Sequence, residues 1–176
     1  MIRLTLANAV RFLIARQHLI IVMSVTYLIL THDWLLIGRR LRPHASMWDL
    51  THVYLGMAVT LLAISFSITS CIKGKWRQYF SWLVADFGQV TTDLRGLIKG
   101  QRPVAGGKGL ISLIEGLGLL LLLTVGLSGI LWLLNQGSSA ALMWRSYHIG
   151  LAHILMYFIV LHVICAALHL LDFIKN

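Results

Sequence analysis

The sequence predicts an all-α integral membrane protein, a bundle of four spanning helices. Two observations support this fold class: the composition is strongly apolar, and four long stretches carry almost no charge. Hydrophobic residues make up 58% of the 176 residues and charged ones only 12%, whereas soluble domains have about 45–50% apolar and about 25% charged residues. A water-soluble fold of this length could not bury so much apolar surface. We therefore expect residues 1–176 to form a single membrane domain.

Each of the four apolar stretches is long enough to cross a bilayer, which takes about 20 mainly apolar residues. The expected spans cover residues 12–31, 48–72, 110–134 and 147–173. Several arginines precede the first stretch, as they would precede the apolar core of a signal peptide. No small-residue cleavage site follows it, however, so we interpret it as a retained signal-anchor helix.

The basic residues predict the orientation of the spans. The N-terminus, the loop 73–109 and the C-terminus together hold eleven of the 15 Lys and Arg residues, and the opposite side holds four. Because short cytoplasmic loops carry the excess of positive residues, we expect both termini in the cytoplasm. Arg39, Arg40 and Arg42 run against this rule. The net charge of +9 is thus an orientation signal, and we expect membrane lipid but no nucleic acid as partner.

The loop between the second and third spans has a helical pattern of its own. A period of three and four residues predicts one amphipathic helix lying in the membrane interface, and packing there is favoured over a docking surface for a partner protein. The apolar residues that define the pattern are Trp76, Phe80, Leu83, Phe87, Val90, Leu94 and Leu97.

Histidines inside the spans are the main candidates for function, because ionisable residues in a membrane are costly. His148 and His162 of the fourth span are fourteen residues apart, which places them within about 40° on one helix face and about 21 Å apart along the axis. Two ligands so arranged can serve two haems stacked across the membrane. Cys71 and Cys165 form no CxxCH motif, which argues against covalently attached haem.

Depth in the membrane predicts the partner of each histidine. His18 of the first span and His162 should lie towards the cytoplasm, whereas His52 of the second span and His148 should lie near the opposite side. The pairs His18–His162 and His52–His148 can then each provide bis-histidine ligation to a b-type haem iron between helices. A small residue, Gly56, follows His52 by one turn and would leave room for the macrocycle.

Three stretches make the sequence similar to a known family. The chain resembles the bacterial cytochrome b561 family and the related b-type cytochrome subunits of nickel–iron hydrogenases and formate dehydrogenases. In that family the first and second helices give one haem ligand each and the fourth gives two, which here implies His18, His52, His148 and His162. The matching stretches are Arg16-Gln17-His18-Leu19, His52-Val53-Tyr54-Leu55-Gly56, and the fourth span from His148 through Met156-Tyr157-Phe158 and His162 to Ala166-Ala167-Leu168-His169.

The resemblance implies electron transfer through two haem b groups between a quinone pool and a redox partner protein. The chain would be the membrane cytochrome b subunit of a respiratory complex in the bacterial inner membrane. Arg16 and Arg145 are then candidates for contacts with haem propionates, and His169, Glu115 and Asp172 for a quinone site.

Two alternatives stay open. One is a free-standing quinone-linked oxidoreductase of the cytochrome b561 type, for example a superoxide-oxidising one. The other is a haem-free small transporter or structural membrane protein, in which the histidines would line a polar pathway.

Overall fold

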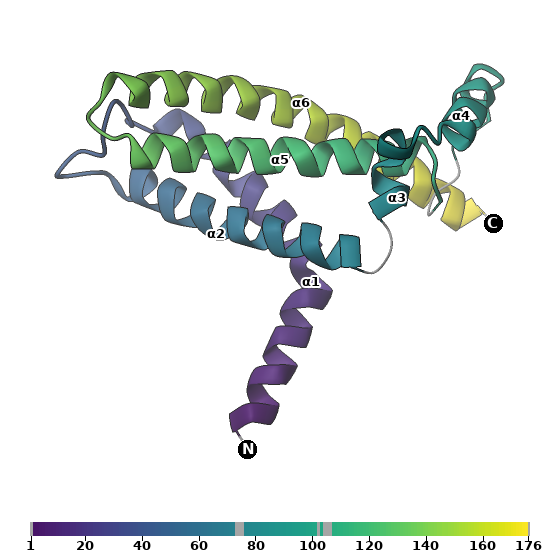
Figure 1. Ribbon diagram of the computed structural model, residues 1–176, viewed down its shortest axis with the longest axis horizontal. Helices are drawn as coiled ribbons and strands as arrows, with labels where there is room; N and C mark the ends of the chain where they lie inside the picture. The colour runs from purple at the N-terminus through teal and green to yellow at the C-terminus, as the bar shows by residue number, and fades with distance from the viewer. Residues whose placement is uncertain (1, 73–75, 102, 104–106, 176) are drawn as a thin grey trace. The chain divides into compact units, whose positions relative to one another are not determined.

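The computed structural model describes the chain except residues 1, 73–75, 102, 104–106 and 176. Side chains are described except also at residues 2–7, 9–11, 13, 165 and 168–175. In the described residues all regular secondary structure is helical and there is no strand, which confirms the predicted all-α class (Figure 1). The elements are α1 (Ile2–Leu30), η1 (His32–Trp34), α2 (Met47–Ser70), α3 (Trp76–Tyr79), η3 (Ser81–Val84), α4 (Gly88–Ile98), α5 (Leu110–Leu134) and α6 (Ser139–Lys175).

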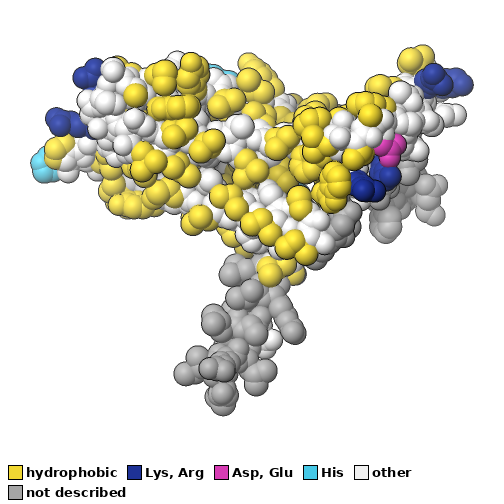
Figure 2. Space-filling view, in the orientation of Figure 1, with side chains coloured by type: hydrophobic (Ala, Val, Ile, Leu, Met, Phe, Trp, Pro, Cys, Tyr) yellow, Lys and Arg dark blue, Asp and Glu magenta, His cyan; other side chains and the backbone are white. Residues whose placement is uncertain are grey.

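Three of these helices are long and apolar enough to cross a membrane: α2, α5 and the part of α6 from Ser139 to Ile164. In α1, the apolar part with described side chains is shorter, Ile14–Leu30. Large hydrophobic side chains are exposed along the long helices, and Figure 2 shows them spread over the visible surface. Such a surface suits lipid better than water. The chain therefore has three candidate spans, and a fourth crossing by α1 stays a prediction.

The last helix begins earlier than expected. The Gly- and Ser-containing stretch before Tyr147 was predicted to be loop up to Arg145, but α6 starts at Ser139. After Gly137, which has a positive φ of 86°, the residues Ala140 to Met143 are good helix formers. They extend the helix, so Arg145 lies on α6 rather than in a loop.

The single amphipathic helix predicted in the loop between α2 and α5 is also wrong in detail. The short helix α3 and the 3-10 turn η3 are followed by Ala85, whose φ of 53° is left-handed and ends that run. A separate helix, α4, begins at Gly88. The apolar period continues across the break, and that is why periodicity alone does not reveal it.

The chain forms two compact units, and the first contains residues 1–68 and 123–151. Within it, the buried Gln17 of α1 donates a 2.6 Å hydrogen bond from Nε2 to the Ser65 hydroxyl of α2. Helices α2 and α5 approach closely where Gly126 faces Thr60, since a Cβ at Gly126 would collide with the threonine side chain. Small residues at helix contacts allow this close approach in membrane proteins.

The second unit contains residues 69–122 and 152–176. Here too, glycines of α5 allow close approach of neighbouring groups. Gly116 faces the Tyr79 backbone of α3, and Gly118 faces the Phe158 ring of α6. The Gln78 side chain donates to the buried Ser112 hydroxyl at 3.1 Å. These contacts hold the loop helices of this unit against α5.

Replacing Gly126 with leucine should destabilise the protein. The added side chain must displace Thr60, and overpacking of this kind typically costs about 1–3 kcal/mol. Thermal unfolding of the purified protein in detergent measures the change. Gly150→Ala is the matched control, because its Cβ has no neighbour within 4 Å, and it should unfold no earlier than the wild type. Equal unfolding temperatures for the two variants would contradict the packing described here.

Candidate functional site

Two of the predicted ligands, His52 of α2 and His148 of α6, face each other in the first unit. Their ring centroids are 6.1 Å apart and their planes are at 87°, and both rings are half-buried. An imidazole nitrogen bonds a metal ion at about 2.0–2.1 Å and lies about 1.1 Å from its own ring centre, so a shared metal implies centroids roughly 6.3 Å apart. The observed separation is therefore compatible with two histidines that bind one metal ion.

The ring of His148 is held by hydrogen bonds from one side. Its Nδ1 lies 3.0 Å from the Val125 carbonyl oxygen of α5 and 3.1 Å from the Ser128 hydroxyl. Because a carbonyl only accepts, the contact with Val125 assigns the proton of the neutral ring to Nδ1 and the lone pair to Nε2. Histidines that bind metals almost always donate their other N–H in this way. His148 thus has the tautomer and support that a metal ligand needs.

His52 has a different environment. Within the described part of the chain, no group forms a hydrogen bond with its buried Nδ1, and an unsatisfied buried group costs about 1–3 kcal/mol. One turn along α2, Gly56 has no neighbour within 4 Å of the place where a Cβ would stand. Residues four apart share a helix face, so there is open space next to His52 on its own side of the helix. The open space fits a site for a bulky group, whereas His52 lacks the hydrogen-bonded support that His148 has.

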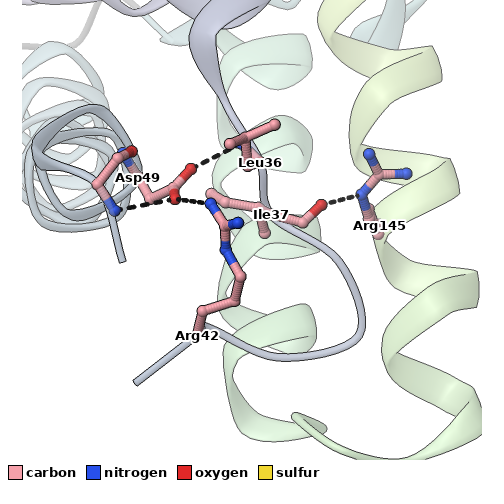
Figure 3. Close-up of polar contacts among 6 residues, drawn as sticks. Leu36, Ile37, Arg42, Asp49 and Arg145 are labelled. Carbon is pink, nitrogen blue, oxygen red and sulfur yellow. Dashed lines mark hydrogen bonds and ion pairs between the residues drawn. The ribbon is translucent and has the colours of Figure 1, made fainter. Parts of the chain in front are cut away.

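A short backbone segment joins the two helices that carry these histidines (Figure 3). The Leu36 N–H donates to Asp49 Oδ1 at 2.8 Å, and Arg145 Nε donates to the Ile37 carbonyl at 2.7 Å. Asp49 is three residues before His52, and Arg145 is three residues before His148. The segment 36–37 therefore links α2 to α6 one helical turn away from both rings.

Asp49 is the centre of this link. Its side chain is only 1% exposed, and it also accepts from the Ser46 N–H at 3.2 Å and from Arg42 at 3.3 Å. The Ser46 hydroxyl in turn accepts from the Asp49 N–H at 3.1 Å. This reciprocal pair is a capping box at the start of α2. Sequence reasoning missed Asp49, although the Ser-x-x-Asp pattern before an apolar run is a signal for it.

The loop continues over the turn between α5 and α6, and both lie at the same end of the first unit (Figure 1). Trp132 Nε1 donates to the Gly38 carbonyl at 3.0 Å. The Gly137 N–H donates to the Arg39 carbonyl at 3.1 Å, and the Leu41 N–H to the Gln136 side chain at 2.8 Å. These bonds hold the loop in place beside the histidine pair.

The other predicted ligand pair, His18 and His162, is divided between the two units. In the first unit the exposed His18 lies 6.0 Å from the Phe66 ring, and in the second the half-buried His162 stacks on Phe158 at 5.7 Å and 23°. Each ring thus has an aromatic neighbour. Their pairing across one haem stays a prediction.

The two arginines expected near haem propionates have other neighbours. Arg16 is exposed, with its guanidinium carbon 6.0 Å from the centre of the Phe12 ring. Arg145 uses Nε for the Ile37 carbonyl, which gives it a structural role that the sequence did not predict. A propionate contact for either residue stays a prediction.

Of the residues expected at a quinone site, only Glu115 has a described side chain, whereas those of His169 and Asp172 lie outside the described residues. Glu115 is half-buried on α5. Burial raises the pKa of the nearby Tyr79 hydroxyl above its usual value, and the negative charge of Glu115 raises it further. The quinone site stays a prediction.

Comparisons of the chain with known protein families, with curated proteins and with solved structures find no match. The fold alone thus defines its class, an all-α protein with three helices able to cross a membrane. Among the described residues, no three His, Cys, Asp or Glu side chains gather as ligands for a metal ion. The site that the described residues do form is the two-histidine arrangement of His52 and His148.

Replacing Asp49 with asparagine should destabilise the protein by about 1–3 kcal/mol, because the amide weakens charge-assisted hydrogen bonds that satisfy the loop backbone. Thermal unfolding in detergent measures this loss. Asp33→Asn removes the same charge from a side chain that is 81% exposed and should change stability by no more than about 0.5 kcal/mol. If both variants unfolded at the wild-type temperature, Asp49 would not have the role described here.

Proposed function

We propose that the chain is a membrane cytochrome that holds two b-type haems and passes electrons across the bilayer between a quinone pool and a redox partner. The observation that carries the proposal is the pairing of His52 with His148 at 6.1 Å, with Nδ1 of His148 held by the Val125 carbonyl. The pair would hold one haem, and His18 with His162 would hold the other. When bound, each haem would supply a centre that gains and loses one electron.

The residues at the first site have distinct tasks in this proposal. His52 and His148 would both bind the haem iron, so the iron would serve electron transfer and not the binding of oxygen or a substrate. Val125 and Ser128 fix the ring of His148 and direct Nε2 away from α5. Gly129 lets that ring lie close to α5, since a Cβ there would stand 3.3 Å from His148 Cε1. Fixed ligands suit electron transfer because little rearrangement accompanies the change of charge.

Two observations support the second site. One is the helical spacing of His148 and His162, and the other is that His18 and His162 each have an aromatic neighbour. Phe66 lies beside His18 and Phe158 beside His162, and each would limit rotation of its histidine. In the proposed orientation the excess of basic residues would face the cytoplasm, as the positive-inside rule predicts. This haem would then lie towards the cytoplasm of a bacterial inner membrane, with both termini on that side. The quinone would then bind at the cytoplasmic end, near Glu115.

Two forms of this function differ in whether the chain works with a second protein. As the cytochrome b subunit of a respiratory complex it would purify with a stoichiometric redox protein. As a free-standing quinone-linked oxidoreductase it would turn over quinone by itself. We favour the subunit.

Removing either histidine of the first pair should remove one haem. The purified protein should show the b-type bands in a reduced-minus-oxidised spectrum and two haems per chain, and His52→Ala and His148→Ala should each retain one, since an axial bond is lost. Haem extraction and counting measures this. His153→Ala, at an exposed position on α6, is the control and should retain two. A wild-type spectrum without b-type bands would sink the proposal in favour of a haem-free membrane protein.

The pairing of the remaining ligands is tested separately. His18→Ala and His162→Ala should each lose the same haem, so the haem left in both variants should have one and the same midpoint potential. Redox titration of the two variants measures it. If the two variants kept haems of different potential, His18 and His162 would not share an iron.

A further inference from the structure

Helix α4 is tied to the first residue of a candidate membrane span. The buried carboxylate of Asp93 accepts the Leu110 N–H at 2.8 Å, and Leu110 begins α5. A second link joins Asp86, just before α4, to Lys108, just before α5, at 2.9 Å. Because α5 is one of the three helices able to cross a membrane, these bonds hold α4 at the level where α5 would enter the bilayer.

One side of α4 packs inside its unit, and an apolar flank next to that side is uncovered. Val90 and Asp93 are buried. On the neighbouring flank, about 90° further round the helix, Phe87, Leu94 and Ile98 are 45%, 46% and 88% exposed. These three follow each other by seven and four residues, which is two turns and one turn, so they form a single apolar stripe along the helix.

Two basic residues border that stripe. Arg95 and Lys99 are both exposed, and each directly follows a stripe residue, so each lies about 100° further round the helix. They are four residues apart and therefore share a face. None of the ion pairs in the described part of the chain uses either one. The outward side of α4 thus has an apolar stripe with a positively charged edge, at the boundary of the membrane.

We propose that α4 binds anionic phospholipid, with the stripe Phe87–Leu94–Ile98 against the acyl chains and Arg95 and Lys99 on the headgroup phosphates. Helices that lie in the interface combine an apolar face with Lys and Arg in this way, and a basic residue near an anionic membrane surface strengthens binding roughly fivefold. Charge complementarity selects the occupant: a neutral lipid surface satisfies the stripe but not the basic edge. The proposal does not depend on haem.

The test is hydrogen exchange of the α4 amides in the full-length protein, reconstituted in nanodiscs of phosphatidylcholine alone or mixed with phosphatidylglycerol. Exchange across Thr91–Ile98 should be several-fold slower in the anionic discs, and the difference should shrink at high salt, which screens the charges. The double variant Arg95→Gln/Lys99→Gln should lose the slowing. The control Arg39→Gln/Arg40→Gln removes two charges at exposed positions of the loop 35–46 and should retain the slowing.

Further arms separate the alternatives. Leu94→Asn/Ile98→Asn should raise exchange in both lipids, because it interrupts the apolar stripe while leaving the basic edge. Equal exchange of the wild type in the two kinds of disc would overturn the proposal and leave α4 as a surface for a partner protein. Slowing of the same size by inorganic phosphate in neutral discs would also overturn it, since the edge would then be a phosphate site and not a lipid surface.

Discussion

The carboxylate of Asp49 is the interaction on which the end of the first unit depends. It lies almost wholly out of solvent, caps α2 and accepts the Leu36 N–H. A buried carboxylate is tolerated only when its oxygens are fully used, and here two backbone amides and Arg42 use them. A comparable arrangement recurs in the second unit, where Asp93 accepts the first backbone N–H of α5. In both units a buried aspartate holds a connecting segment at the first turn of a long apolar helix.

This constraint reaches the histidine pair through the segment 36–37. Because that segment also accepts from Arg145, α2 and α6 are linked one turn from the rings of His52 and His148. The polar contacts of this segment therefore hold the two helices together next to the ring pair. In the proposed function, a scaffold that holds both histidines would limit rearrangement when the site binds its ligand.

Much of the fold follows from simple sequence properties, and the exceptions have physical causes. Hydropathy gives the three long helices to within a few residues at most ends, since a lipid-facing helix must be apolar throughout. It places the start of α6 too late, because the composition of residues 135–145 suggests a loop although its alanines favour helix. It also overlooks the left-handed turn at Ala85, which leaves the apolar period intact.

The site, like the fold, has parts that the sequence predicts and parts that it does not. Spacing and depth brought His52 and His148 together in the sequence analysis, and the two rings do lie face to edge. The hydrogen bond between His148 and the Val125 carbonyl could not be predicted, because any residue type can provide a backbone acceptor. The capping box of Ser46 and Asp49, by contrast, does have a sequence pattern, Ser-x-x-Asp before an apolar run.

In the proposed function, His52 and His148 share one iron. Low-temperature EPR of the oxidised, purified protein tests it most directly when the wild type is compared with His148→Ala. The account predicts that the wild type gives low-spin ferric signals of bis-histidine haem, and that one of them disappears in the variant. A wild type with only high-spin ferric haem, or with no haem signal, would contradict it.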